Sequence, residues 1–192
     1  ARQLIQYLRL IKNDNIKNLR SDINLEKIIH NADSLGCHLF DTSRAYGGSE
    51  RDLGRGLKSI KRSNVFITTK LCNADQREKT VREAYEYSLK QLEMDYVDLY
   101  LIHWPQTGTW AKSWKQIEQI YEEGLCKAIG VCNFNIHHFE ELKQFANIMP
   151  MVNQIECHPL FTQEELRSYC RHNKIQVMAY TPTARGDFRL RS

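Results

Sequence analysis

The sequence predicts an α/β protein whose parallel strands form a TIM (β/α)8-type barrel. Strand-like apolar runs alternate with helix-like segments at a spacing of about 25 to 30 residues, which indicates repeated βα units. The runs are continuously apolar, as expected of strands that are buried on both faces. Polar residues follow almost every run, and the chain has neither a GxGxxG motif nor a Walker-type phosphate loop. This distribution favours a barrel with its site at the C-terminal ends of the strands over an open nucleotide-binding sheet.

The expected elements follow one another without a long linker, so we predict a single domain over residues 1–192. Strands are expected where Val, Ile, Leu, Tyr and Phe cluster, at residues 38–41, 65–69, 97–102, 128–131, 152–155 and 176–180. Apolar residues at helical spacing lie between these runs, in stripes that begin at Leu25, Leu53, Val81, Phe139 and Leu166.

The composition is that of an ordinary globular protein, with 42% hydrophobic and 26% charged residues. No apolar run approaches the length of about 20 residues that a membrane span needs, so no membrane partner is expected. The net charge of +4 is too small to indicate a nucleic-acid partner. The densest basic cluster, Lys58, Lys61 and Arg62, is expected at the C-terminal end of a helix, where it would complement the helix dipole.

The six cysteines are scattered without a CxxC pair, which predicts free thiols in a reducing compartment. The first twelve residues mix polar side chains with leucines and lack the apolar core of a secretory signal, so we expect a cytoplasmic protein. The Cys and His spacings match no structural zinc pattern, and no metal is predicted.

Four ionisable residues of complementary chemistry lie at or just beyond the ends of three consecutive apolar runs. Asp41 ends the first run and Tyr46 follows it closely, while Lys70 and His103 end the next two. Each has a structural explanation when taken singly: a loop cap, a turn aromatic, a solvated lysine and a packed histidine. Because the C-terminal ends of parallel strands meet at one edge, the four in this order predict an active site.

The motifs around these residues resemble those of the aldo-keto reductases. They are DTSRAYGGSE (41–50), TTK (68–70), LIHWP (101–105), AIGVCNF (128–134), VNQIECHP (152–159) and MAYTP (178–182), which occur in the family's order. The resemblance implies an (α/β)8 barrel, NADPH as the cofactor, and a reversible reduction of aldehydes and ketones to alcohols. The expected partner is therefore a small-molecule carbonyl substrate.

The resemblance also assigns roles to individual residues. Asp41, Tyr46, Lys70 and His103 correspond to the catalytic tetrad. The residues that correspond to the nicotinamide contacts are Cys132, Asn133 and Gln154 at the carboxamide and Tyr180 against the ring. Ordinary burial in the core is the alternative interpretation for the amides and for Tyr180. The family usually has Ser at the position of Cys132, and a thiol is a poorer hydrogen-bond partner. Two tryptophans, Trp104 and Trp110, are candidates for the wall of an apolar substrate pocket.

The tetrad suggests how the chain would treat a carbonyl. The reduced oxygen must gain a proton, and Tyr46 is the candidate general acid. An ordinary tyrosine has a pKa of about 10, and a neighbouring ammonium such as Lys70 favours its ionised form. Asp41 would hold Lys70 charged and oriented, and His103 would donate a hydrogen bond to the carbonyl oxygen.

The two ends of the chain depart from the family pattern. A barrel of this type needs about 250 residues. If residues 6–11 form the first strand, residues 176–180 form the seventh, and the sequence stops soon after it. The eighth strand and the family's basic cofactor motif are therefore absent from this sequence. We therefore expect weak or no NADPH binding by this chain alone. Residues 6–11 lack the glycines of the family's first strand; a divergent strand is favoured over an N-terminal helix.

An incomplete barrel has unpaired edges. The chain is interpreted in one of three ways. It is a fragment of a longer enzyme, it comprises only the ordered residues of a longer chain, or it is a natural short form, either a monomer stabilised by a partner or an oligomer that covers those edges. An alternative function is that of a catalytically weak or inactive relative that acts as a nucleotide-binding or scaffold subunit.

Overall fold

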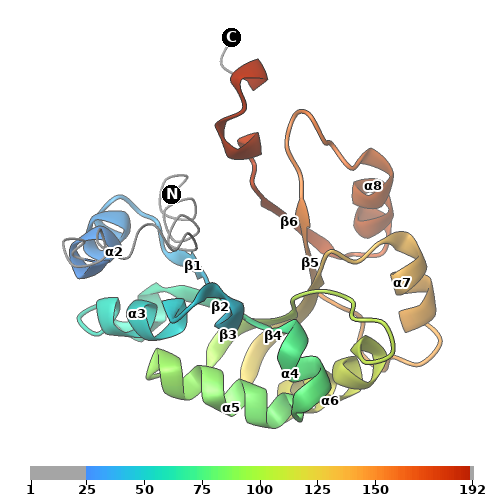
Figure 1. Cartoon of the computed structure of the whole chain (residues 1–192), viewed down its shortest axis with the longest axis horizontal. Coiled ribbons are helices and arrows are strands. Elements are labelled where there is room, and N and C mark those ends of the chain that lie inside the picture. Colours follow the sequence, from blue (N-terminus) through green and yellow to red (C-terminus); the bar gives the residue numbers. More distant parts are fainter. Residues whose placement is uncertain (1–24, 191–192) are drawn as a thin grey trace.

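A computed structural model describes residues 25–190, and its centre is a six-stranded parallel sheet in the order β1-β2-β3-β4-β5-β6. The strands are β1 (Leu39–Asp41), β2 (Phe66–Leu71), β3 (Val97–Ile102), β4 (Cys126–Cys132), β5 (Val152–Glu156) and β6 (Gln176–Tyr180). Figure 1 shows them curving as one surface with helices along its outer side, the arrangement of an incomplete TIM barrel. The predicted fold class is therefore confirmed.

Seven α-helices are described. They are α2 (Leu25–Ser34), α3 (Ser49–Gly56), α4 (Asn73–Glu78), α5 (Val81–Leu92), α6 (Trp110–Glu122), α7 (Ile136–Leu142) and α8 (Glu164–His172). Four short 3-10 helices accompany them: η2 (Arg44–Tyr46), η3 (Arg62–Asn64), η4 (Ala184–Gly186) and η5 (Phe188–Leu190). Two strands, β3 and β6, have the bounds that the apolar runs predict, and the other four differ by at most two residues at an end. The expectation for residues 6–11 lies outside the described residues.

The sheet separates two groups of buried apolar residues. Tyr100 and Ile102 of β3 face outward into the main core, whereas Leu99 and Leu101 belong to a smaller group inside the curve of the sheet. Successive side chains of a strand alternate between its two faces, so burial on both sides explains the continuous apolar runs. All six residues of β3 are buried.

Register places the predicted site residues on the inner face. Partners in a parallel ladder share a face, as do residues two apart in one strand. Lys70 pairs with Leu101, Cys132 with Gln154, and Gln154 with Met178. The C-terminal edge of this inner face, with the loops that leave it, is called the rim below.

The basic cluster Lys58, Lys61 and Arg62 was expected at the C-terminal end of a helix, and the structure does not place it there. The helix α3 ends at Gly56, before the cluster begins. Two residues of the cluster form ion pairs with carboxylates outside α3. Lys58 contacts Glu93 at 2.7 Å, and Arg62 contacts the buried Asp98 at 2.7 Å. Specific ion pairs, rather than the dipole of α3, account for these two positions.

Two further predictions, the lack of a membrane-spanning segment and the presence of free thiols, can be compared with the structure. Between residues 25 and 190, no helix has both the length and the hydropathy needed to cross a bilayer. All six cysteines are free thiols.

Candidate active site

A buried ion pair joins the ends of β1 and β2. Lys70 Nζ lies 2.5 Å from Asp41 Oδ2 and donates a second hydrogen bond of 2.8 Å to the backbone oxygen of Thr42. The Lys70 side chain has no exposed surface, and that of Asp41 is 13% exposed. Burial alone would lower the pKa of Lys70, but the negative charge of the neighbouring Asp41 carboxylate and its hydrogen bond to Lys70 oppose burial, and the pKa lies above its ordinary value. Lys70 is thus a fixed cation at the rim.

Tyr46 reaches the same place from the loop after β1. It ends η2, a short 3-10 turn that Ser43 caps by accepting a hydrogen bond from the Ala45 N–H at 3.2 Å. Gly47 follows in the left-handed conformation (φ 57°), which glycine adopts without strain and which ends the turn directly after Tyr46. The centroid of the Tyr46 ring lies 5.1 Å from Lys70 Nζ. The turn therefore places the phenol beside the buried ammonium.

His103 follows β3 directly and completes the group. Its backbone N–H donates to Leu71 O at 3.1 Å, which continues the ladder by one residue. Its Nε2 lies 3.3 Å from the Tyr46 hydroxyl, and the two rings meet edge to face with centroids 5.5 Å apart. The structure thus brings together all four residues predicted as a tetrad.

Two amides and a tyrosine come from the next three strands: Asn133 directly follows β4, Gln154 lies within β5, and Tyr180 ends β6. Asn133 donates to the His103 backbone oxygen at 3.1 Å and accepts from the Tyr180 hydroxyl at 2.8 Å. It has a φ of 63°, a left-handed conformation that Asn tolerates better than most residues. Gln154 donates to Asp41 Oδ1 at 2.7 Å, across the inside of the sheet. The predicted nicotinamide contacts are therefore linked to the tetrad by hydrogen bonds.

Cys132 is placed differently from these neighbours. It is 1% exposed and packs in the inner apolar group with Leu99 and Leu101. Its thiol lies 3.9 Å from Gln154 Oε1, and burial raises its pKa far above the ordinary value. The thiol therefore lies in the apolar group inside the curve of the sheet.

The two tryptophans predicted as pocket walls have different environments. Trp104 is 45% exposed and follows His103 directly in the chain. Trp110 begins α6, is 5% exposed, and its ring packs edge-on against Phe134 with centroids 5.2 Å apart. In this structure Trp110 serves the core, whereas Trp104 is accessible to a ligand.

Polar residues behind the tetrad were not singled out by the sequence analysis. Ser43 is fully buried, and its hydroxyl lies 3.2 Å from His103 Nδ1. Glu50 is 3% exposed and accepts a hydrogen bond of 2.6 Å from the Thr69 hydroxyl, next to Lys70 in the chain. Burial raises the pKa of Glu50 despite that bond. The signal that could have identified both is the unusual number of polar residues in DTSRAYGGSE, directly after a buried strand.

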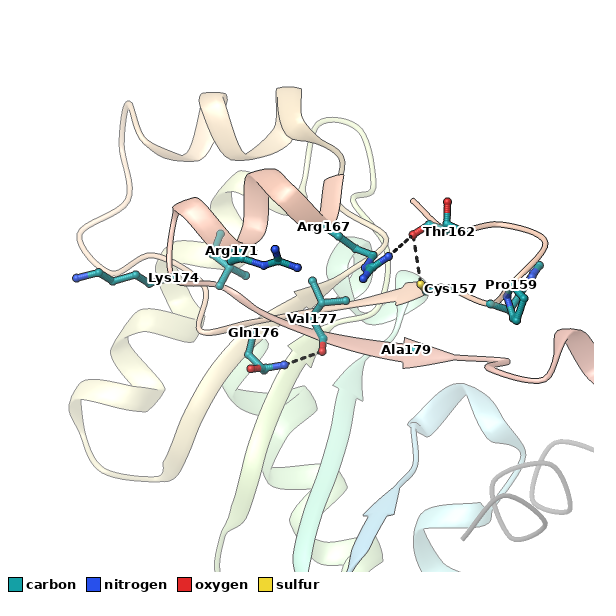
Figure 2. Close-up of a pocket in the computed structure, with 11 residues that line it drawn as sticks. Cys157, Pro159, Thr162, Arg167, Arg171, Lys174, Gln176, Val177 and Ala179 are labelled. Atoms are coloured by element: carbon teal, nitrogen blue, oxygen red, sulfur yellow. Dashed lines mark hydrogen bonds between the residues drawn. The ribbon is translucent and has the colours of Figure 1, made fainter. Parts of the chain in front are cut away.

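A separate hollow lies at the far edge of the sheet, between α8 and β6. It measures about 720 Å³, and Figure 2 shows the side chains of Arg167, Arg171 and Lys174 around it. Its lining residues, all from 157 to 179, include none of the predicted site residues. It is therefore distinct from the rim. Across residues 25–190, no group of three or more His, Cys, Asp or Glu is arranged to hold a metal ion.

The sequence is similar to a known protein family and to characterised reductases. The family model described as "Aldo/keto reductase family" matches residues 17–191. Glyoxal reductase of Bacillus subtilis is 45% identical over 153 residues, which are 79% of this chain and 55% of that protein. Methylglyoxal reductase DkgA of Salmonella typhimurium is 44% identical over 162 residues, 82% of this chain and 58% of that protein.

Solved structures agree with these matches. The aldo-keto reductase MGS-M4 from a Medee basin deep-sea metagenome library has a TM-score of 0.78 and 42% identity, covering 88% of this chain and 61% of that one. A Bombyx mori aldo-keto reductase in complex with NADP has a TM-score of 0.71 and 34% identity, covering 79% and 55%. The chain spans a little more than half the length of the curated relatives named here, at 55% and 58%.

Proposed function

This chain belongs to the aldo/keto reductase family, and we propose that its rim is the carbonyl-reduction site of an NADP-dependent oxidoreductase. The observation that carries the proposal is the continuous set of contacts from Asp41 through Lys70 to Tyr46 and His103. A buried ammonium beside a phenol, with an imidazole on the other side of its hydroxyl, is suited to deliver a proton to an oxygen that is gaining negative charge.

The residues of this chain would divide the work as follows. The reduced nicotinamide, when bound, supplies the hydride for the carbonyl carbon. The Tyr46 hydroxyl gives its proton to the carbonyl oxygen, and Lys70 stabilises the phenolate that remains until solvent restores the proton. Asp41 keeps Lys70 charged and in place. His103 Nε2, 3.3 Å from the Tyr46 hydroxyl, offers a second hydrogen bond to the same oxygen.

The residues along β4 to β6 fit the nicotinamide end of the cofactor. A carboxamide needs a donor and an acceptor side by side, and the Asn133 and Gln154 amides offer both. Both are held by hydrogen bonds to tetrad residues, which orients them. We propose that they bind the carboxamide and that Tyr180 lies against the ring. Cys132 fits less well, because its thiol is buried and bonds weakly. The preference for NADP is supported by the NADP complex of the Bombyx mori relative.

We propose a small, reactive carbonyl compound as the substrate. The relatives at 44% and 45% identity are named methylglyoxal reductase and glyoxal reductase. Trp104, exposed and next to His103, would form an apolar wall beside the carbonyl.

The test is the oxidation of NADPH by this chain with methylglyoxal as the substrate, at NADPH concentrations raised into the millimolar range to offset weak binding. Nicotinamide fluorescence measured in the same titration reports cofactor binding separately. Binding followed by turnover supports the proposal. Binding with no turnover of methylglyoxal or of a simple aromatic aldehyde would contradict it and favour a nucleotide-binding or scaffold subunit.

A further inference from the structure

Ser43 occupies a position between the two proposed hydrogen-bond donors. It is fully buried, at 0% exposure, in the extended conformation that precedes η2. Its backbone oxygen accepts from the Tyr46 N–H at 2.9 Å, and its hydroxyl oxygen accepts from the Ala45 N–H at 3.2 Å. The same hydroxyl lies 3.2 Å from His103 Nδ1. Ser43 thus contacts the turn that carries Tyr46 and the ring of His103 at once.

The hydrogen-bonding capacity of a hydroxyl determines what this contact means for the ring. A serine hydroxyl has one hydrogen to donate and two lone pairs to accept. Ala45 N–H uses one lone pair, and the other side-chain partner of Ser43 among residues 25–190 is His103 Nδ1. If Nδ1 carried a proton, it would donate to Ser43, and the serine hydrogen would be left buried with no acceptor in this part of the chain. Leaving a buried donor unsatisfied costs about 1–3 kcal/mol.

The opposite arrangement gives the Ser43 hydrogen an acceptor and the Nδ1 lone pair a donor. The Ser43 hydroxyl donates to Nδ1, and a neutral imidazole then carries its proton on Nε2. Nε2 is the atom that lies 3.3 Å from the Tyr46 hydroxyl. In this tautomer His103 presents a donor toward the place proposed for the carbonyl oxygen. In the other tautomer it would present a lone pair, which repels that oxygen.

We infer that Ser43 is a positioning residue that holds neutral His103 in the tautomer with its proton on Nε2. The inference rests on the proposed function for its consequence in catalysis, but the state of the ring belongs to the chain alone. Because Ser43 also caps η2, one buried side chain fixes both the position of Tyr46 and the proton of His103.

The experiment is nitrogen-15 NMR of the imidazole rings at a pH of about 8.5, where an ordinary histidine is neutral. The chain has seven histidines, and His103→Gln identifies the signal by its disappearance. We expect wild-type His103 to show a protonated Nε2 and an unprotonated Nδ1. Ser43→Ala should increase the population protonated at Nδ1, and Ser43→Thr, which keeps the hydroxyl, should retain the wild-type pattern.

A second variant guards against loss of the fold. Glycine is tolerated at helix caps at a cost of a few tenths of a kcal/mol, so Ser43→Gly removes the hydroxyl while preserving the turn. A wild-type ring protonated at Nδ1 would overturn the inference, and so would a His103 signal that is unchanged in Ser43→Ala and Ser43→Gly.

The turnover number provides a second test, because a purely structural role of Ser43 would not change kcat while NADPH binding stays the same. Loss of a preorganised donor lowers kcat by factors of a hundred or more, and a mixture of tautomers loses part of that effect. We expect Ser43→Ala to lower kcat about tenfold with unchanged NADPH binding. The ring spectrum needs neither cofactor nor substrate. A wild-type chain that reduces no carbonyl would therefore count against the proposed function, while the spectrum would still decide the role of Ser43.

Discussion

The replacement Asp41→Asn tests how the site holds a buried charge. The wild-type carboxylate lies 2.5 Å from a Lys70 ammonium that has no exposed surface. The amide has the same shape but no charge, and it has one acceptor oxygen where the carboxylate has two. In the wild type, Lys70 and Gln154 each donate to one of these oxygens, so in Asp41→Asn one of the two donors faces an amide NH2. Breaking a buried pair by removing one partner costs about 3–5 kcal/mol. Because Asp41 is 13% exposed and the Thr42 contact remains, we expect the lower end, about 3 kcal/mol.

A loss of that size is measurable, because single domains have unfolding free energies of about 5–15 kcal/mol. Urea denaturation at neutral pH gives the value, and a second series at about pH 9.5 tests its cause. In the wild type, Asp41 raises the pKa of Lys70, so the pair stabilises the fold until the pH rises through that value. In Asp41→Asn, burial is no longer opposed by the carboxylate, so Lys70 should lose its proton more easily. The difference in stability should therefore narrow as the pH rises.

The matched control is Glu123→Gln, which breaks an ion pair with Arg82 of similar length, 2.6 Å, whose side chains are 53% and 39% exposed. Exposed pairs are screened by water, so this variant should lose little stability at either pH. The reasoning would be refuted if Asp41→Asn were as stable as Glu123→Gln, or if its deficit were the same at both pH values.

Two further substitutions test the sheet and the support of the tetrad. A Cβ at Gly130 would lie 2.5 Å from Val152 O, so Gly130→Ala should lower the unfolding free energy by about 1–3 kcal/mol in urea titrations; an unchanged midpoint would show that β4 and β5 are less closely packed. Burial raises the pKa of Glu50, so wild-type stability should fall as the pH rises from the ordinary carboxyl pKa through that raised value. Glu50→Gln should therefore be more stable than the wild type at pH 8, and its thermal unfolding temperature should change less between pH 5 and pH 8. An unfolding temperature that changes more with pH in the variant than in the wild type would contradict this reasoning.

The meeting of Asp41, Tyr46, Lys70 and His103 could be predicted from the sequence, because the rules of a parallel sheet bring strand ends together. Asp41, Lys70 and His103 each stand at the C-terminal end of an apolar run, and register in a parallel ladder leaves little freedom in where they meet. Tyr46 follows from the same logic, since only a short turn separates it from β1. The strand bounds were recovered well because burial on both faces leaves a continuous apolar signal.

Other features depend on packing that a linear pattern does not encode. Trp110 is at the start of α6, and whether its ring faces the rim or the core depends on how that helix lies against Phe134 and against His138 of α7. The helix α4 is polar along its sequence and has no apolar stripe to reveal it. The links from Ser43 to His103 and from Glu50 to Thr69 join residues 60 and 19 positions apart, and depend on the path of the loop after β1.

The measurement that tests the central claim most directly is single-turnover reduction of methylglyoxal by Tyr46→Phe at an NADPH concentration that saturates the binding signal. Loss of a general acid lowers the rate by about a hundredfold to ten-thousandfold, and cofactor binding should stay near the wild-type level. Tyr169→Phe, which removes a hydroxyl bonded to Glu140 on the outer surface, should react like the wild type. A Tyr46→Phe variant as fast as the wild type would contradict the account, because proton delivery would then have to come from another group.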